Sequence, residues 1–576
     1  AFTSAGYSID GVRAVLSNRP DLAEYQCNSA MAAAKVYHKA PLQIADEVVS
    51  SLNAADDGAF FESATAAAPG FINLTLAPAA LADYLNQISS ADKYGISGIG
   101  AGQTAIIDYG GPNVAKPLHV GHLRAAVIGE SIKRILNFNG YKTIGDVHLG
   151  DWGLQMGLII AELSERQPEL PYFNDNYQGD YPAEAPFTIS DLEEIYPTAS
   201  GRAKTDEAFA AKAHEATALL QQGHRGYTAL FRHIINVSVN DLKKNYTKLD
   251  VNFELWNGES DAQKYIPDML SMLREKDLMH ESEGAQVVDV ALPDDSKEIP
   301  PCIILKKDGA SLYATTDLAT LVQRERDFAP DHVIYVVDKR QDMHFVQVFR
   351  VAKKAGIIPE DTDLTFIGFG TMNGRDGKPF KTREGGVMRL ENLISEINSA
   401  VKDRMTASGM DESEITDETA GIIGLAALKY GDLSNQATKD YVFDTERFSS
   451  FEGNTGPYIL YTMVRIKSIL RKYTDNGGVI KSELLPASSP SEKAVQLLAA
   501  RAGDVIEGAA RELAPHRICQ YIYELSNAFN SFYHEVKILA ETDEDKKAGY
   551  IALLSLILRV LNDCIYMLGF SAPERM

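Results

Sequence analysis

The sequence predicts an α/β protein: a parallel-sheet core, preceded by a small α+β module and followed by an all-helical region. Three observations support this. The chain has 576 residues, enough for several domains at ~100–200 residues each. Between about residues 104 and 370, short apolar runs alternate with helical stretches, as in a parallel sheet covered by helices. After about residue 430, apolar positions recur only at helical spacing, which is typical of a helical bundle.

The first region, residues 1–87, mixes two helical stretches with a strand-like run. The helices are expected at 29–37 and 41–52, and the strand at 70–76. A glycine-rich segment follows at 95–102. It precedes a strand, whereas a dinucleotide-binding glycine loop follows one, so we interpret it as a linker.

The second region, residues 100–435, contains four apolar runs that predict parallel strands, at 104–109, 142–148, 332–338 and 364–370. Parallel strands place a ligand crevice at their carboxyl ends. Residues 165–210 are rich in proline, tyrosine and acidic residues and are expected to be an insertion on this core.

The third region, residues 445–576, is predicted to be a helical bundle with apolar periodicity at 458–470, 492–506, 516–536 and 548–568. Its most apolar stretch, 551–570, is interrupted by Arg559, Asn562 and Asp563. These polar residues favour a buried amphipathic helix over a membrane-spanning one.

Composition narrows the class of protein. The formal net charge is −23, which excludes a uniformly basic nucleic-acid coat but not a local basic face. The four cysteines form no C-x-x-C pair, so neither a zinc ribbon nor a dense disulfide framework is expected. Residues 1–15 lack the long apolar run of a signal peptide. We expect a cytoplasmic enzyme with no membrane association and no bound structural metal.

The stretch from Thr104 to Gly140 is the most informative for chemistry. A strand ends at Asp108, a Gly-Gly-Pro turn follows, and His119-Val-Gly-His122 stands where the next helix begins. Histidines three residues apart share a helix face and can donate to phosphate oxygens, and a helix N-terminus favours an anion. Gly121 leaves room for a flat base. The alternative, a zinc-binding pair, is normally spaced four apart as in H-E-x-x-H, which is absent.

A second cationic element lies between a strand and a helix, from Phe369 to Leu390. It is rich in glycine and carries four positive charges, at Arg375, Lys378, Lys381 and Arg383. Such a loop can close on a polyphosphate and stabilise charge that develops as pyrophosphate leaves. The alternative is an exposed hairpin with solvated lysines.

The segment P-N-V-A-K-P-L-H-V-G-H-L-R resembles the nucleotide-binding motif of class I aminoacyl-tRNA synthetases, and of the arginyl-tRNA synthetases in particular. Further segments resemble that family in order along the chain: H-L-G-D-W-G at 148–153, L-Y-A-T-T-D at 312–317, Q-D-M-H at 341–344, G-P-Y at 456–458 and the terminal P-E-R-M. The likeness covers nearly the whole chain from about residue 100, and the N-terminal module more weakly. It implies a Rossmann-type catalytic domain, a tRNA-contacting N-terminal module and an anticodon-binding bundle.

The resemblance implies arginine–tRNA ligase activity. ATP and L-arginine would form arginyl-adenylate and pyrophosphate, and the arginyl group would then move to the 3′ end of tRNA(Arg). Mg²⁺ would accompany ATP, bound largely through the phosphates. The family also leads us to expect that tRNA binds before arginine is activated. We further expect a monomer.

By the same resemblance, the phosphate-binding and catalytic residues are His119, His122, Lys116, Lys381 and Arg383, with Gly121 and Lys378 also at ATP. The loop departs from the family's K-M-S-K-S pattern. If Lys381 takes the place of the first lysine, Glu384 stands where the second would fall. Lys116, just before H-V-G-H, is then the expected substitute cation.

A guanidinium is best bound by a carboxylate that accepts paired N–H donors. Asp317 supplies one, with the aromatic Tyr313 one helical turn earlier. Asn113 and Gln341 suit the amino and carboxylate ends of the substrate. Asp108 either holds the substrate ammonium or is a surface or capping residue.

In the bundle, the expected tRNA contacts are Tyr458, Tyr461, Arg465, Asn530 and Tyr533, since aromatic side chains stack on unpaired bases. Phe529 is expected in the core. Two alternatives stay open from the residues alone: an adenylate-forming nucleotidyltransferase that does not use tRNA, and a non-enzymatic RNA-binding scaffold.

Overall fold

The structure, a computed structural model, describes residues 1–56, 58–378 and 388–576. Its contacts divide the chain into two compact units. One comprises Ala1–Ile96, Thr462–Val505 and Tyr521–Asp563, and the other Ser97–Tyr461, Ile506–Gln520 and Cys564–Met576. The C-terminal helices contribute to both units, so the units do not follow the three regions predicted from sequence.

The first unit contains a four-stranded antiparallel sheet in the order β1-β2-β4-β3. Side chains of α2, among them Ile44 and Val48, pack with Ile72 and Leu74 of β4 in its core. The predicted helices and strand correspond to α1, α2 and β4. The elements are β1 (Ala14–Leu16), β2 (Tyr25–Cys27), α1 (Ser29–Tyr37), α2 (Pro41–Asp56), β3 (Phe61–Ala67), β4 (Phe71–Leu76) and α3 (Pro78–Ser90).

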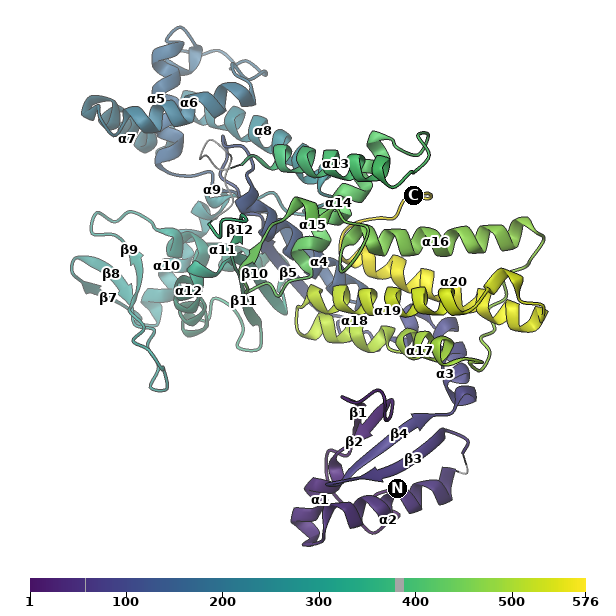
Figure 1. The fold of residues 1–576 in the computed structure, drawn as a ribbon. Helices are drawn as coiled ribbons and strands as arrows, with labels where there is room; N and C mark the ends of the chain where they lie inside the picture. The colour runs from purple at the N-terminus through teal and green to yellow at the C-terminus, as the bar shows by residue number, and fades with distance from the viewer. Residues whose placement is uncertain (57, 379–387) are drawn as a thin grey trace. The chain divides into compact units, whose positions relative to one another are not determined.

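The second unit is organised around a parallel sheet in the order β11-β10-β5-β6, which Figure 1 shows among the helices of this unit. Its strands are β5 (Thr104–Tyr109), β6 (Lys142–Asp146), β10 (His332–Asp338) and β11 (Asp363–Phe369). All three pairings are parallel. The predicted α/β class with a parallel core is confirmed, and each strand lies within a residue or two of its predicted apolar run.

Helices connect these strands and pack on the sheet. Leu318 and Val322 of α11 pack with Ile106 of β5 and Val333 of β10 in one apolar cluster. The connecting helices are α4 (Val120–Phe138), α5 (Leu154–Arg166), α11 (Tyr313–Phe328) and α12 (Asp342–Ala355). Because a crossover helix runs antiparallel to the strand it feeds, the N-termini of α4 and α11 both lie at the carboxyl edge of the sheet.

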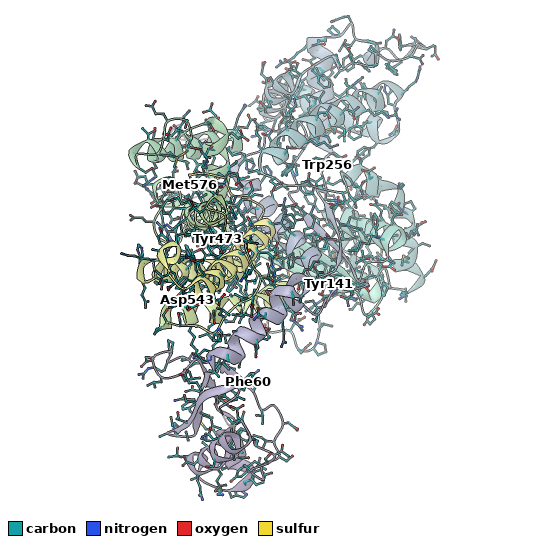
Figure 2. All side chains as sticks on the ribbon, turned by 90° about the vertical axis from the view of Figure 1, so that its right-hand side faces the viewer. Phe60, Tyr141, Trp256, Tyr473, Asp543 and Met576 are labelled. Carbon is teal, nitrogen blue, oxygen red and sulfur yellow. The ribbon has the colours of Figure 1, made fainter. Side chains whose placement is uncertain are left out.

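The predicted insertion at 165–210 contains α6 (Ile189–Arg202) and the start of α7 (Glu207–Gln221), and the inserted helical segment continues past the predicted boundary through α8 (Arg225–Lys248). Helices α6, α7 and α8 pack with α5 in the upper left of Figure 1. Trp256, labelled in Figure 2, lies beyond α8 and packs edge-on against Phe253, at 5.5 Å between ring centroids. Short elements then lead to α11: α9 (Glu259–Ala262), α10 (Ile266–Glu275), β7 (Met279–Ser282), β8 (Ala285–Val288) and β9 (Cys302–Leu305). The antiparallel sheet β7-β8-β9 was not predicted.

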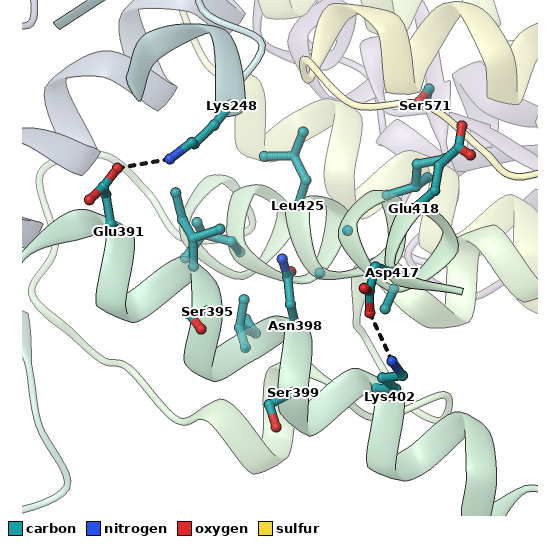
Figure 3. A pocket seen from close by; sticks show the side chains of 17 residues that line it. Lys248, Glu391, Ser395, Asn398, Ser399, Lys402, Asp417, Glu418, Leu425 and Ser571 are labelled. Atoms are coloured by element: carbon teal, nitrogen blue, oxygen red, sulfur yellow. Dashed lines mark hydrogen bonds and ion pairs between the residues drawn. The ribbon is translucent and has the colours of Figure 1, made fainter. Parts of the chain in front are cut away.

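Beyond β11 the chain forms a parallel pair of short strands and two long packed helices. The elements are β12 (Met372–Asn373), α13 (Leu390–Ala407), α14 (Asp417–Leu433), β13 (Tyr441–Val442) and α15 (Thr445–Phe448). A cavity of about 760 Å³ lies between α13 and α14. Figure 3 shows an ion pair at each end of it, Lys248 with Glu391 and Lys402 with Asp417.

The remaining helices are α16 (Gly456–Asp475), α17 (Pro490–Ala499), α18 (Ala502–Arg511), α19 (Pro515–Glu535) and α20 (Glu544–Met567). The predicted continuous helix at 492–506 is divided between α17 and α18. Among the described residues, α20 is the one helix long and apolar enough to cross a membrane, but 72% of its most apolar window is buried in the protein. That burial agrees with the helix predicted at 551–570.

Candidate active site

The two histidines of H-V-G-H form the N-terminal cap of α4. His119 is the N-cap residue, and its Nδ1 accepts a hydrogen bond from the Gly121 amide at 3.0 Å. The Nδ1 of His122 accepts from the His119 amide at 3.3 Å. The two rings lie 3.9 Å apart between centroids. Because a neutral imidazole has one N–H, an accepting Nδ1 leaves the hydrogen on Nε2. Each ring therefore offers an Nε2–H donor to a ligand.

Both imidazoles are held in the neutral form. Burial lowers the pKa of His122 to about 3, and neighbouring His119 and Lys116 lower it further. Burial, and then Lys116, also lower the pKa of His119. The rings are thus hydrogen-bond donors at neutral pH, and the positive charge of this segment resides on Lys116.

The turn that carries Asn113 and Lys116 is held by the surrounding elements. The Val114 amide donates to the Gly150 carbonyl at 3.1 Å. The Ala115 amide donates to Ser238 Oγ of α8 at 2.9 Å. A side chain at position 150 would meet Asn113, because a Cβ there would lie 2.4 Å from Asn113 Oδ1. The glycine of H-L-G-D-W-G, Gly150, therefore leaves the space that the Asn113 side chain occupies.

The cationic loop is described on both sides of residues 379–387. Lys378 is exposed, and its carbonyl accepts from the Gly374 amide at 2.8 Å. The predicted residues Lys381 and Arg383 lie outside the described residues. Arg375, also counted among the loop's cations, pairs with Asp444 at 2.7 Å and with Glu446 at 2.8 Å.

Just after residue 387 the chain runs beside H-V-G-H. The Val120 amide donates to the Met388 carbonyl at 3.1 Å, and the Leu390 amide donates to the Leu118 carbonyl at 3.0 Å. These bonds tie the C-terminal end of the loop to the start of α4. The two segments that were predicted to bind one triphosphate are therefore adjacent.

The candidate arginine site lies at the start of α11. Tyr313, the first residue of the helix, is 73% exposed. Asp317 is one turn later, and its Oδ2 lies 2.5 Å from His344 Nε2. His344 belongs to α12, directly after β10, so this contact places Asp317 at the carboxyl edge of the sheet. Gln341 and Asn113 are both exposed there.

A cavity of about 580 Å³ opens beside Tyr313, with Glu259 and Trp152 also in its lining. Burial raises the pKa of Glu259 to about 7. His148 lowers this pKa, whereas the negative charges of Asp151 and Asp317 raise it. A cation entering this cavity would restore the charged form of Glu259. The environment therefore favours a positively charged ligand.

Asp108 is buried and already has a cationic partner. Arg324 Nη2 lies 2.5 Å from Asp108 Oδ2 and 2.7 Å from Asp146 Oδ2. The surface or capping alternative for Asp108 is therefore wrong, because the residue is buried. Burial raises its pKa, and Arg324 opposes that rise. The side chains of Asp108, Asp146 and His148 are close enough to share a metal ion, but the guanidinium of Arg324 already contacts one oxygen of each carboxylate.

The candidate tRNA residues are on α16 and α19. Arg465 Nη1 donates to Asn530 Oδ1 at 2.6 Å, and its guanidinium carbon lies 5.1 Å from the Tyr533 ring centroid. Tyr461 lines a separate cavity of about 450 Å³ with the terminal Met576. Tyr458 is half-buried. Phe529 is buried, as predicted.

Comparison with known proteins decides the family. Residues 85–445 match the model described as "tRNA synthetases class I (R), catalytic domain". The chain belongs to the class I arginyl-tRNA synthetases. The "Arginyl tRNA synthetase N terminal domain" model matches residues 4–76 of this synthetase, and the "DALR anticodon binding domain" model matches residues 459–576.

Individual relatives of this arginyl-tRNA synthetase cover its full length. The arginine–tRNA ligase of Agathobacter rectalis is 58% identical over all of this chain and 98% of the relative. Two solved structures share the fold. The arginyl-tRNA synthetase of Plasmodium falciparum has a TM-score of 0.81 at 24% identity, covering 100% of this chain and 97% of its own. That of Thermus thermophilus has a TM-score of 0.78 at 21% identity, covering 98% and 96%.

Three groups in this synthetase were missed from sequence. His344 was identified only as part of the Q-D-M-H motif and had no predicted role, although its contact with Asp317 orients that carboxylate. Arg324 and Glu259 carried no local signal at all. Arg324 meets Asp108 across 216 residues of chain, so its role depends on tertiary packing. By contrast, the pairing of His119 with His122 is encoded within four residues.

Proposed function

We propose that the chain is an arginine–tRNA ligase that activates L-arginine with ATP and transfers the arginyl group to the 3′ end of tRNA(Arg). Family membership and a 58% identical arginine–tRNA ligase support the activity. The observation that carries the residue-level proposal is the arrangement at one edge of the sheet. Two neutral histidines cap α4, and an aspartate with an aromatic ring begins α11.

In the activation step, the arginine carboxylate attacks the α-phosphorus of ATP and pyrophosphate leaves. The Nε2–H groups of His119 and His122 donate to phosphate oxygens, and Lys116 supplies the positive charge beside them. The proposed ATP site also includes Gly121, Lys378, Lys381 and Arg383. No covalent enzyme intermediate is required, because fixed donors and charge in a pre-formed site lower the barrier by positioning and electrostatics.

The guanidinium of arginine is proposed to bind Asp317, held by His344, with the ring of Tyr313 alongside. Asn113 and Gln341 would hold the amino and carboxylate ends. Asp108 acts on the substrate ammonium through its negative field, since Arg324 already shares its oxygen. A lysine substrate would lack the planar fork of donors that a carboxylate binds in pairs.

Mg²⁺ is proposed to enter with ATP, held by the phosphates. The described side chains at the start of α4 are imidazoles and an ammonium, which do not suit this hard cation, so the chain itself supplies no ligand for it there. We also propose that tRNA binds before activation.

We propose that tRNA contacts Tyr458, Tyr461, Arg465, Asn530 and Tyr533. The N-terminal module, residues 1–87, would contact tRNA as well, with the catalytic domain at 100–435 and the anticodon-binding domain at 445–576. We further propose that the enzyme is monomeric and cytoplasmic.

The test is aminoacylation with labelled arginine, together with pyrophosphate exchange in the presence and absence of tRNA. We expect charging of tRNA(Arg), loss of charging in His122→Ala, and unchanged tRNA affinity in that variant. Robust exchange with another amino acid would favour a different nucleotidyltransferase. Failure of the wild-type protein to charge tRNA at all would favour a scaffold.

A further inference from the structure

One helix of the insertion contacts both segments of the candidate ATP site. On α6, Glu193 and Tyr196 are three residues apart and so share a face. The Tyr196 ring centroid lies 4.6 Å from Lys116 Nζ. Glu193 Oε2 lies 3.0 Å from an Nη of Arg389, the residue that pairs with His119 in an isolated antiparallel bridge.

Helix α6 is itself firmly attached to α5. Arg166 of α5 pairs with Glu194 at 2.9 Å. Arg202, the last residue of α6, pairs with Glu165 of α5 at 2.5 Å. Because α5 begins directly after H-L-G-D-W-G, the face that carries Glu193 and Tyr196 is connected to the catalytic core through a braced helix pair.

The other side of the contact is also held in place. The backbone around Arg389 is hydrogen-bonded to Leu118 and Val120. In the first turn of α13, Glu391 pairs with Lys248 of α8 at 2.8 Å, as Figure 3 shows. Two helices of the inserted segment, α6 and α8, thus each form an ion pair with the C-terminal end of the cationic loop or the start of α13, at Arg389 and Glu391.

Lys116 needs such support because a lysine side chain has four rotatable bonds and loses much freedom when it is fixed. Lys116 stands three residues before His119 in the chain, and its charge contributes to the lowered pKa of both histidines. An ammonium over a tyrosine ring is attracted by the negative ring face. The Tyr196 ring can therefore restrict the position of Lys116 without neutralising its charge, whereas a carboxylate would neutralise that charge.

We propose that Tyr196 and Glu193 are positioning residues for the activation step: Tyr196 orients Lys116 toward the phosphates, and Glu193 fixes the end of the cationic loop through Arg389. The insertion is then a working part of the adenylation site. This inference rests on the proposed role of Lys116 at ATP.

The first experiment is a double-mutant cycle measured by ATP–pyrophosphate exchange with tRNA present. Tyr196→Leu should lower kcat for activation about 5-fold with little change in KM for arginine, and Tyr196→Phe should keep most of the activity because the ring remains. In a Lys116→Met background, Tyr196→Leu should have no further effect. Tyr181→Leu is the matched control: it removes a comparable contact with Arg225 within the insertion and should leave kcat unchanged.

The outcomes separate the two proposals. If Lys116→Met exchanges like wild type, the proposed role of Lys116 at ATP is wrong. If Lys116→Met is impaired but Tyr196→Leu adds its full effect on top, Lys116 acts at ATP and Tyr196 does not orient it. A rise in kcat in Tyr196→Leu would mean that the ring restrains Lys116 away from ATP, which also overturns the inference.

The second experiment tests Glu193. Glu193→Gln should lower kcat for activation, and the charge reversal Glu193→Arg combined with Arg389→Glu should restore part of it. Glu207→Gln is the control, because Glu207 is an exposed carboxylate in the first turn of α7, and it should retain wild-type kcat. Equal losses in Glu193→Gln and Glu207→Gln, or no rescue by the reversal, would overturn the positioning role of Glu193. Thermal unfolding and tRNA affinity confirm that each variant is folded.

Discussion

Asp317 offers a direct test of how arginine is recognised. The change Asp317→Asn keeps the shape of the side chain and removes its charge. In the structure one carboxylate oxygen lies 2.5 Å from His344 Nε2, and the proposed role assigns the other oxygen to the substrate. A hydrogen bond to a charged group contributes about 1.5–3 kcal/mol. At about 1.4 kcal/mol per tenfold, kcat/KM for arginine should fall about 10- to 150-fold.

The assay is pyrophosphate exchange with varied arginine at saturating ATP and tRNA, followed by varied ATP at saturating arginine. The loss should appear in KM for arginine, and KM for ATP should stay within about twofold, a difference of only ~0.4 kcal/mol. Asp327→Asn is the control, because Asp327 is an exposed carboxylate in the last turn of the same helix. A change in kcat/KM for arginine below threefold, or an equal loss for ATP, would refute the assigned role.

Three further predictions follow from the buried charges. Because His122 has a pKa of about 3, its imidazole should stay neutral from pH 5 to 8. The measurement is the pH profile of pyrophosphate exchange, and a loss of activity within this range in wild type but not in His122→Asn would contradict the prediction. Arg324→Met should destabilise the fold by about 3–5 kcal/mol in urea unfolding, because two buried carboxylates lose their cation; a loss under about 1 kcal/mol would show that water or protonation replaces the guanidinium. Lys429 is buried with a pKa lowered to about 7, chiefly by burial and next by Arg134. The unfolded chain therefore binds more protons than the folded chain between pH 7 and about 10, so the free energy of unfolding rises with pH in this range. In urea titrations, the free energy of unfolding of Lys429→Met relative to that of wild type should fall between pH 7 and about 9.5.

The fold was predictable to the extent that it rests on local patterns. The four core strands follow their apolar runs, because a buried parallel strand needs a continuous apolar segment. The antiparallel sheet β7–β9 was missed because its strands are only four residues long and partly exposed, which leaves little alternation to detect. The break between α17 and α18 lies at two residues without a proline or glycine signal.

The candidate site divides in the same way. His119 and His122 could be placed at a helix start, since a turn, a cap and helical periodicity all lie within about twenty residues. Asp317 could be named but its partner could not, because His344 reaches it from another helix across 27 residues. Asp108 shows the limit most clearly: its neighbour Arg324 comes from a helix more than 200 residues away.

The sequence by itself determined the class of fold, the order of the motifs and the residues at the two helix starts, because hydrophobic period and cap chemistry act over one or two turns. Only the tertiary structure decided which charges neutralise one another and which helix supports Lys116. Those contacts depend on how distant segments pack, and the free energy of a buried charge is set by the groups that packing brings within a few ångströms.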